Sequence, residues 1–153
     1  MNFFKKIQEN FFVRNLYSIV ESNDPIKLKN TLQSKKLEND LFQSSVGLLH
    51  FACDLGNRKE MIQILLEFGW KSIINEKDKS GLSALHISVM RGDIESISVL
   101  LDFGSDPNVR DNDGVTPFIL CKSFSGTEDI VELLLAKGAN PKLTDKSGKI
   151  YLM

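Results

Sequence analysis

The chain has 153 residues, of which 42% are hydrophobic and 25% charged, and its formal net charge is −1. This length can bury about 70% of the unfolded surface in one core, so we expect a single domain, and the mixed near-neutral charge disfavours a nucleic-acid partner. No apolar run approaches the ~20 residues of a membrane-spanning helix, and polar residues interrupt the N-terminal stretch where a signal peptide would be apolar, so we expect a cytoplasmic protein with no membrane partner.

Residues 1–41 are predicted to form N-terminal capping helices or a degenerate repeat. Apolar residues at helical spacing between Phe11 and Val20 indicate one helix. Asp24-Pro25 then supplies a cap and a first-turn proline for a second helix. The inner stripe of that second helix is expected to consist of Ile26, Leu28 and Leu32.

From residue 42 onward the chain repeats itself. An Asp-x-x-Gly motif recurs with its glycines 33 and then 34 residues apart, beginning at Asp78, Asp111 and Asp145. A Leu-Leu pair ahead of a glycine follows the same period, with glycines at Gly69, Gly104 and Gly138. A period of this size is typical of stacked repeat proteins. We divide the chain into repeats at 42–77, 78–110 and 111–144, followed by a truncated C-terminal cap at 145–153.

Each unit is predicted to contain a hairpin, a helix, a turn and a second helix. In 114–118, glycine suits a tight turn, Thr116 suits a helix cap and Pro117 suits the first helical position. Ser83 takes the capping place one unit earlier, and Gly104 ends an apolar helical stripe that begins at Ile94. The fold class is therefore an all-α repeat solenoid of stacked helix-turn-helix units joined by β-hairpin loops.

The motifs at 111–118 and 132–140, together with Leu85-His86, resemble the ankyrin repeat family. The resemblance extends from Phe42 to Gly148 and implies a protein-binding surface rather than a particular ligand. In such stacks the hairpin tips and the exposed end of each first helix line a concave groove. The sequence departs from the pattern in an expanded stretch at 69–75 and in a lengthened turn at 123–127, and insertions of this kind often lie on a binding face.

The C-terminal repeat is truncated after Gly148, which leaves Ile130, Leu133 and Leu134 without a full repeat to pack against. We expect the last residues to fold back as a minimal cap, formed by Ile150, Tyr151 and Leu152. The alternative is that a partner or a second copy covers this end.

The sequence predicts neither a metal nor a cofactor. His50 and Cys53 have a ligand-like spacing on one helix, but His50 and His86 both occupy the family's histidine position, where the ring braces the hairpin. Cys53 and Cys121 fall at small buried positions of non-adjacent repeats, so we expect no disulfide. Because no catalytic motif is present, we expect no enzyme activity.

The positions without a packing role in the repeat are the candidate partner-binding residues. In chain order they are Gln43, Ser44, Val46, Asp54, Leu55, Lys79, Ser80, Leu82, Met90, Arg91, Asn112, Asp113, Val115, Ser123 and Phe124. Leu82 and Val115 have a second interpretation, as residues that pack partly on the neighbouring repeat. Trp70 is added because tryptophan is common among interface anchors, although it could equally fill the irregular stack.

An ankyrin-like surface without other motifs indicates a protein that acts by binding. Our first hypothesis is an inhibitor of the immunity type, which is a monomer when free and covers a toxin or another enzyme. The abundance of lysine, asparagine, isoleucine and phenylalanine suggests an AT-rich coding sequence, which is compatible with a bacterial source. The alternatives are an adaptor, an effector directed at a host, and a regulatory subunit of a kinase.

Overall fold

The computed structural model describes residues 3–34, 46–149 and 151, with side chains described from Phe11 onward except that of Val46. Helices make up its regular structure, and the described residues contain no strand, as the predicted all-α class requires. The elements are α1 (Phe3–Ser22), α2 (Pro25–Gln33), α4 (Val46–Leu55), α5 (Lys59–Glu67), the 3₁₀ helix η1 (Trp70–Ile73), α6 (Ala84–Arg91), α7 (Ile94–Asp102), α8 (Pro117–Cys121) and α9 (Glu128–Ala136).

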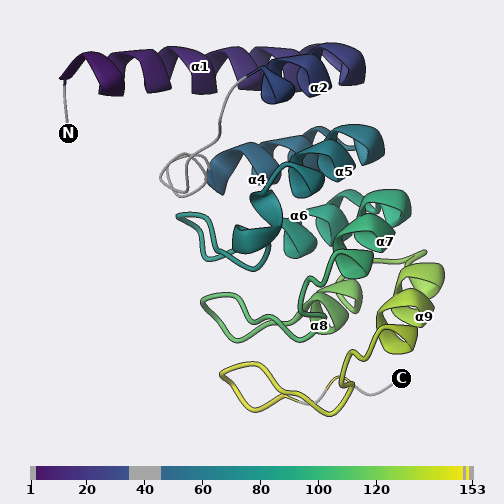
Figure 1. The fold of residues 1–153 in the computed structure, drawn as a ribbon. Helices are drawn as coiled ribbons and strands as arrows, with labels where there is room; N and C mark the ends of the chain where they lie inside the picture. The colour runs from purple at the N-terminus through teal and green to yellow at the C-terminus, as the bar shows by residue number, and fades with distance from the viewer. Residues whose placement is uncertain (1–2, 35–45, 150, 152–153) are drawn as a thin grey trace.

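The helices form two parallel stacks (Figure 1). The first helix of each unit packs on the next, in the order α1, α4, α6 and α8, and the second helices follow as α2, α5, α7 and α9. Within each unit the two helices also pack on each other. Each unit therefore contacts mainly its neighbours, which is the architecture of a solenoid. The exact unit boundaries given above remain a prediction.

The predicted helix caps are present. The Asp24 carboxylate accepts a hydrogen bond from the Lys27 amide at 2.9 Å, one residue ahead of the helix that begins at Pro25. Ser83 accepts from the His86 amide at 3.4 Å, and Thr116 accepts from the amide three residues later at 3.3 Å. Each cap satisfies one backbone donor that the first turn of a helix leaves without a partner.

The recurring aspartate organises each hairpin turn. Asp78 Oδ1 accepts hydrogen bonds from the amides of Ser80 at 2.8 Å and Leu82 at 2.9 Å, and Asp111 makes the corresponding bonds one unit later. Successive hairpins also touch, because the Asn112 side-chain amide donates to the Ser80 carbonyl at 3.3 Å. A repeated local motif thus positions the hairpin tips beside one another.

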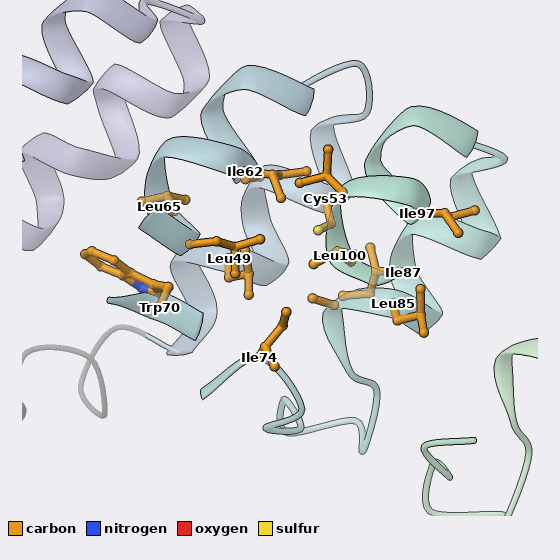
Figure 2. Packing of buried hydrophobic residues seen from close by; sticks show 14 of the residues in the cluster. Leu49, Cys53, Ile62, Leu65, Trp70, Ile74, Leu85, Ile87, Ile97 and Leu100 are labelled. Carbon is orange, nitrogen blue, oxygen red and sulfur yellow. The ribbon is translucent and has the colours of Figure 1, made fainter. Parts of the chain in front are cut away.

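One continuous cluster of buried apolar side chains runs through the stack (Figure 2). Leu28 and Leu32 belong to it, but Ile26 is 74% exposed, so the predicted inner stripe of α2 was wrong at that residue. Ile94 is likewise 40% exposed at the start of the α7 stripe. Both residues lie in the first turn of a second helix, where the chain has only just left the turn between helices.

Trp70 is fully buried in this cluster. It opens the 3₁₀ helix of the expanded 69–75 stretch, and Figure 2 shows its ring among the core side chains. Its prediction as a partner-binding residue was therefore wrong, and its alternative interpretation, a side chain that fills the irregular stack, is correct. A large aromatic side chain gains more from complete burial than from exposure.

At the C-terminal end Tyr151 folds back onto the last hairpin, where its hydroxyl donates to Asp145 at 2.7 Å. Hydrogen bonds from Ser147 and then from Tyr151 lower the pKa of Asp145 to about 2. Ile130 and Leu134 are buried in α9, although no complete repeat follows them. The other two predicted cap residues, Ile150 and Leu152, lie outside the described residues.

Candidate protein-binding surface

Three of the predicted apolar contact residues are exposed at the ends of the first helices. Leu55 ends α4 and is 37% exposed, Met90 lies near the end of α6 and is 49% exposed, and Phe124 follows α8 and is 46% exposed. Leu82 and Val115 are partly buried, and Leu82 packs against the core cluster. Gln43, Ser44 and the side chain of Val46 lie outside the described part of the chain.

The predicted polar contact residues that the structure describes are all exposed, namely Asp54, Lys79, Ser80, Arg91, Asn112, Asp113 and Ser123. Those on the hairpin tips connect the tips, since Asn112 bonds to Ser80 and the Asp113 carbonyl accepts from the Lys146 amide at 2.9 Å. We call these exposed residues, together with Leu55, Met90 and Phe124, the binding surface.

Asp54 and Arg91 form an ion pair across two repeats. Arg91 donates from Nη2 at 2.6 Å and from Nε at 3.2 Å, and both bonds reach the same oxygen, Asp54 Oδ1. The two side chains are 55% and 51% exposed. A pair this exposed contributes little stability, of the order of 0.2–1 kcal/mol, so it remains available for contact with another molecule.

A hollow of about 610 Å³ lies beside this ion pair, between α1, α4, α6 and the hairpin at 78–82. Its apolar lining comes from Tyr17, Phe51, Leu82, Ile87 and Met90, and its charged lining from Asp54, Asp78 and Arg91. The rings of Tyr17 and Phe51 lie 5.2 Å apart at an interplanar angle of 50°. The hollow is in the size range of ligand pockets, about 300–1,000 Å³.

Sequence reasoning missed Tyr17 and Phe51 as residues of this surface. The feature of the sequence that could have revealed Tyr17 is Gly47. It occupies the position at which the next two repeats have the capping residues Ser83 and Thr116. A Cβ at position 47 would lie 2.8 Å from the Tyr17 hydroxyl, so glycine allows this close approach. Burial raises the pKa of Tyr17 above its ordinary value, which keeps the hydroxyl protonated.

The histidines brace the hairpins as predicted. Nε2 of His50 lies 3.1 Å from the Leu82 carbonyl oxygen, and Nε2 of His86 lies 3.0 Å from that of Val115. Since a carbonyl can only accept, each Nε2 carries the proton. The described residues contain no group of three or more His, Cys, Asp or Glu side chains that could hold a metal ion.

Both cysteines are buried, in α4 and α8, with α6 packed between these helices. Burial raises the pKa of Cys53 to about 12 and that of Cys121 to about 11. The thiols are therefore protonated near neutral pH and are poor nucleophiles.

In the part of the chain that the structure describes, no helix has the length and apolar character needed to cross a membrane.

Comparisons with known proteins agree with this repeat architecture. A family model of ankyrin repeats in three copies matches residues 28–145. The tyrosine-protein kinase HTK16 of Hydra vulgaris is 32% identical over 127 residues, which cover 80% of this chain and 16% of that protein. The inactive serine/threonine-protein kinase TEX14 of Mus musculus is 35% identical over 101 residues, 66% of this chain and 7% of that protein.

A BTB/POZ domain and ankyrin repeat-containing protein of Oryza sativa subsp. japonica, NH5.2, is 35% identical over 96 residues, 63% of this chain and 18% of that protein. The chain thus spans less than a fifth of the length of each of these three relatives. The family model, in contrast, covers well over half of the chain. The protein belongs to the ankyrin repeat family.

Proposed function

We propose that this protein binds one protein partner, a toxin or another enzyme, and inhibits it by covering its active site. Ankyrin repeats typically bind other proteins. The observation that carries the proposal is the set of exposed apolar side chains at the ends of three successive first helices, Leu55, Met90 and Phe124, of which Met90 also lines a hollow of about 610 Å³. Exposed apolar side chains that are grouped in this way are typical of protein interfaces.

The proposed role is non-enzymatic and cytoplasmic, with a monomer as the free state. In support of the non-enzymatic role, both histidines hydrogen-bond to hairpin carbonyls, and burial raises the pKa of both thiols. Of these histidines and cysteines, only His50 lines the hollow. The four side chains therefore do not converge on one site. Inhibition by occlusion requires only a stable surface of sufficient area, about 800 Å² on each partner.

The second candidate is a regulatory or adaptor role. It is favoured by the names of two relatives, a tyrosine-protein kinase and an inactive serine/threonine-protein kinase. Those relatives carry the similar segment within much longer chains. In this protein the segment would serve to recruit another protein. An adaptor binds several partners weakly, whereas an inhibitor binds one partner tightly.

Site-specific crosslinking tests the proposal. A photo-crosslinking amino acid at Met90, on the binding surface, is compared with the same amino acid at Gln63, which is exposed on α5 in the other stack. After irradiation in cells of the source organism, we expect one dominant crosslinked protein at Met90 and none of it at Gln63. The purified partner should lose its activity when this chain is added in equimolar amount.

Equal crosslinking at both positions would contradict the proposed surface. A partner that keeps its full activity in the saturated complex would contradict inhibition and favour the adaptor role.

A further inference from the structure

We propose that the hollow beside the Asp54–Arg91 pair takes an arginine side chain of the protein partner. This inference rests on the proposed function, since it names the partner group that the binding surface recognises. The hollow combines an apolar floor with carboxylate oxygens at its edge, and three features of its lining select arginine over a purely apolar or an anionic group.

The floor fits the stem and the plane of an arginine side chain. Tyr17 and Phe51 contribute two aromatic rings 5.2 Å apart, and Leu82 and Met90 contribute aliphatic surface. Methylene groups of long cationic side chains pack on such surfaces while the charged head group remains in a polar environment. A guanidinium group also stacks favourably on aromatic faces.

The carboxylates in the lining of the hollow have oxygen atoms that can still accept hydrogen bonds. Arg91 bonds only to Oδ1 of Asp54, and the hairpin amides bond only to Oδ1 of Asp78. Within the described residues, Oδ2 of each carboxylate accepts no hydrogen bond. Among the described residues of the lining, two carboxylates face one arginine, and this excess of negative charge complements a second cation.

The same groups disfavour other occupants. An apolar side chain would remove carboxylate oxygens from water without giving them a donor, which costs free energy. An anion would meet an excess of negative charge. The planar guanidinium carries five donors in a fixed fork and suits several acceptors at once, whereas an ammonium group acts as a point charge.

The Tyr17 hydroxyl adds a further acceptor. It stands over Gly47, at 2.8 Å from the position of a Cβ there, and no hydrogen bond ties it to the described part of the chain. A larger residue at position 47 would push this hydroxyl away. The glycine that breaks the capping pattern of the repeats thereby keeps a polar group at the hollow.

The test titrates the full chain with the capped tripeptide Ac-Ala-Arg-Ala-NH₂ and follows the methyl resonance of Met90 by NMR. Matched tripeptides carry citrulline, which has the shape of arginine without its charge, or leucine. We expect a saturable shift with arginine, and binding of the citrulline and leucine peptides about tenfold weaker or more, because neither peptide can form charge-assisted hydrogen bonds with the carboxylates.

Asp54→Asn should weaken binding of the arginine peptide about tenfold. Its control is Asp102→Asn, which makes the same change in another inter-repeat pair, where Lys137 Nζ lies 2.6 Å from Asp102 Oδ1. This control should leave binding unchanged. Equal binding of the leucine or citrulline peptide, an unshifted Met90 methyl group, or equal losses in both variants would each overturn the assignment.

The outcomes separate this inference from the proposed function. If Met90 crosslinks a partner while the arginine peptide fails to bind, the binding surface stands and only the arginine assignment is wrong. If the arginine peptide binds but no partner is inhibited, the hollow stands and the inhibitor role is wrong.

Discussion

At the residue scale, two features require glycine at position 81, namely its backbone angle and the close contact with a neighbouring side chain. Its φ is +83°, and a Cβ there would lie 2.2 Å from Asn112 Cγ. We predict that Gly81→Ala destabilises the protein by about 2 kcal/mol, since a left-handed L-residue costs about 1–2 kcal/mol and the displaced Asn112 loses a hydrogen bond of about 1 kcal/mol. The measurement is the free energy of unfolding in urea.

Gly92→Ala is the matched control for this prediction. Gly92 has a φ of +66°, but nothing lies within 4 Å of its added Cβ. It should show the backbone cost alone, so the difference between the two variants measures the contact between hairpins. Equal losses in both variants would mean that Asn112 contributes nothing to stacking.

His86 makes stability depend on pH. Burial lowers its pKa below the ordinary value of 6.5, an effect that outweighs the carboxylates of Asp111 and Asp78. Below pH 6.5 the unfolded chain therefore binds the proton more readily than the native protein, so stability is complete above that pH and falls as the solution becomes more acidic. Protonation would also turn Nδ1, which accepts from the Ser83 amide at 3.3 Å, into a donor.

We expect the free energy of unfolding to decrease between about pH 7 and about pH 5, and the variant His86→Gln to show a flatter profile over this range. Denaturant titrations of both proteins at each pH provide the comparison. Parallel profiles would show that another group causes the acid sensitivity.

At the element scale, α8 is the shortest of the described helices in the first-helix stack. It contains five residues, and Ile119 replaces the histidine that braces the hairpin in the two preceding repeats. The following helix lacks a side-chain cap, because Thr127 donates its hydroxyl to the Cys121 carbonyl at 3.1 Å instead. We predict that α8 and α9 open before α6 and α7, because local stability follows local contact density.

Native-state hydrogen exchange checks this at equivalent amides. The Leu120 amide bonds to the Thr116 carbonyl at 2.9 Å, and the Ile87 amide makes the same first-turn bond to Ser83 at 3.2 Å. Leu120 should exchange at least tenfold faster, a difference of about 1.4 kcal/mol in opening free energy. Similar protection at both amides would show that the short helix unfolds only with the whole stack.

At the scale of the whole molecule, the two stacks present different exposed apolar residues. Replacing Met90 and Phe124 with serine should abolish partner binding while leaving the protein folded, since both side chains are about half exposed. The control replaces Ile26 and Ile94, exposed on second helices, with serine. Affinity measured by calorimetry should fall at least tenfold in the first variant alone; a loss in both variants would point to an extended or different interface.

Much of the fold was predictable from the sequence because its signals are local. The turn aspartates, the caps at Asp24, Ser83 and Thr116, and the helix-ending glycines act within about four residues of their own positions. Their recurrence at one period then defines the stack. The exposed positions Met90 and Phe124 were also predictable, because the repeat register places both at the exposed end of a first helix.

The burial of Trp70 and the exposure of Ile26 were not predictable in this way. Both depend on which neighbours fill the space around a side chain, and a period carries no information about an irregular stretch such as 69–75. An insertion that looks like a loop can fold into the core when its side chains find room there.

The sequence by itself therefore determined the repeat architecture and the exposed positions of the proposed binding surface, because periodic local motifs encode both. Only the tertiary structure decided where that surface is hollow. The hollow joins Tyr17, Phe51 and Met90 from three successive units, and within its lining the Tyr17 hydroxyl closely approaches Gly47. Such a cavity results from the packing of side chains far apart in the chain, which short-range spacing does not record.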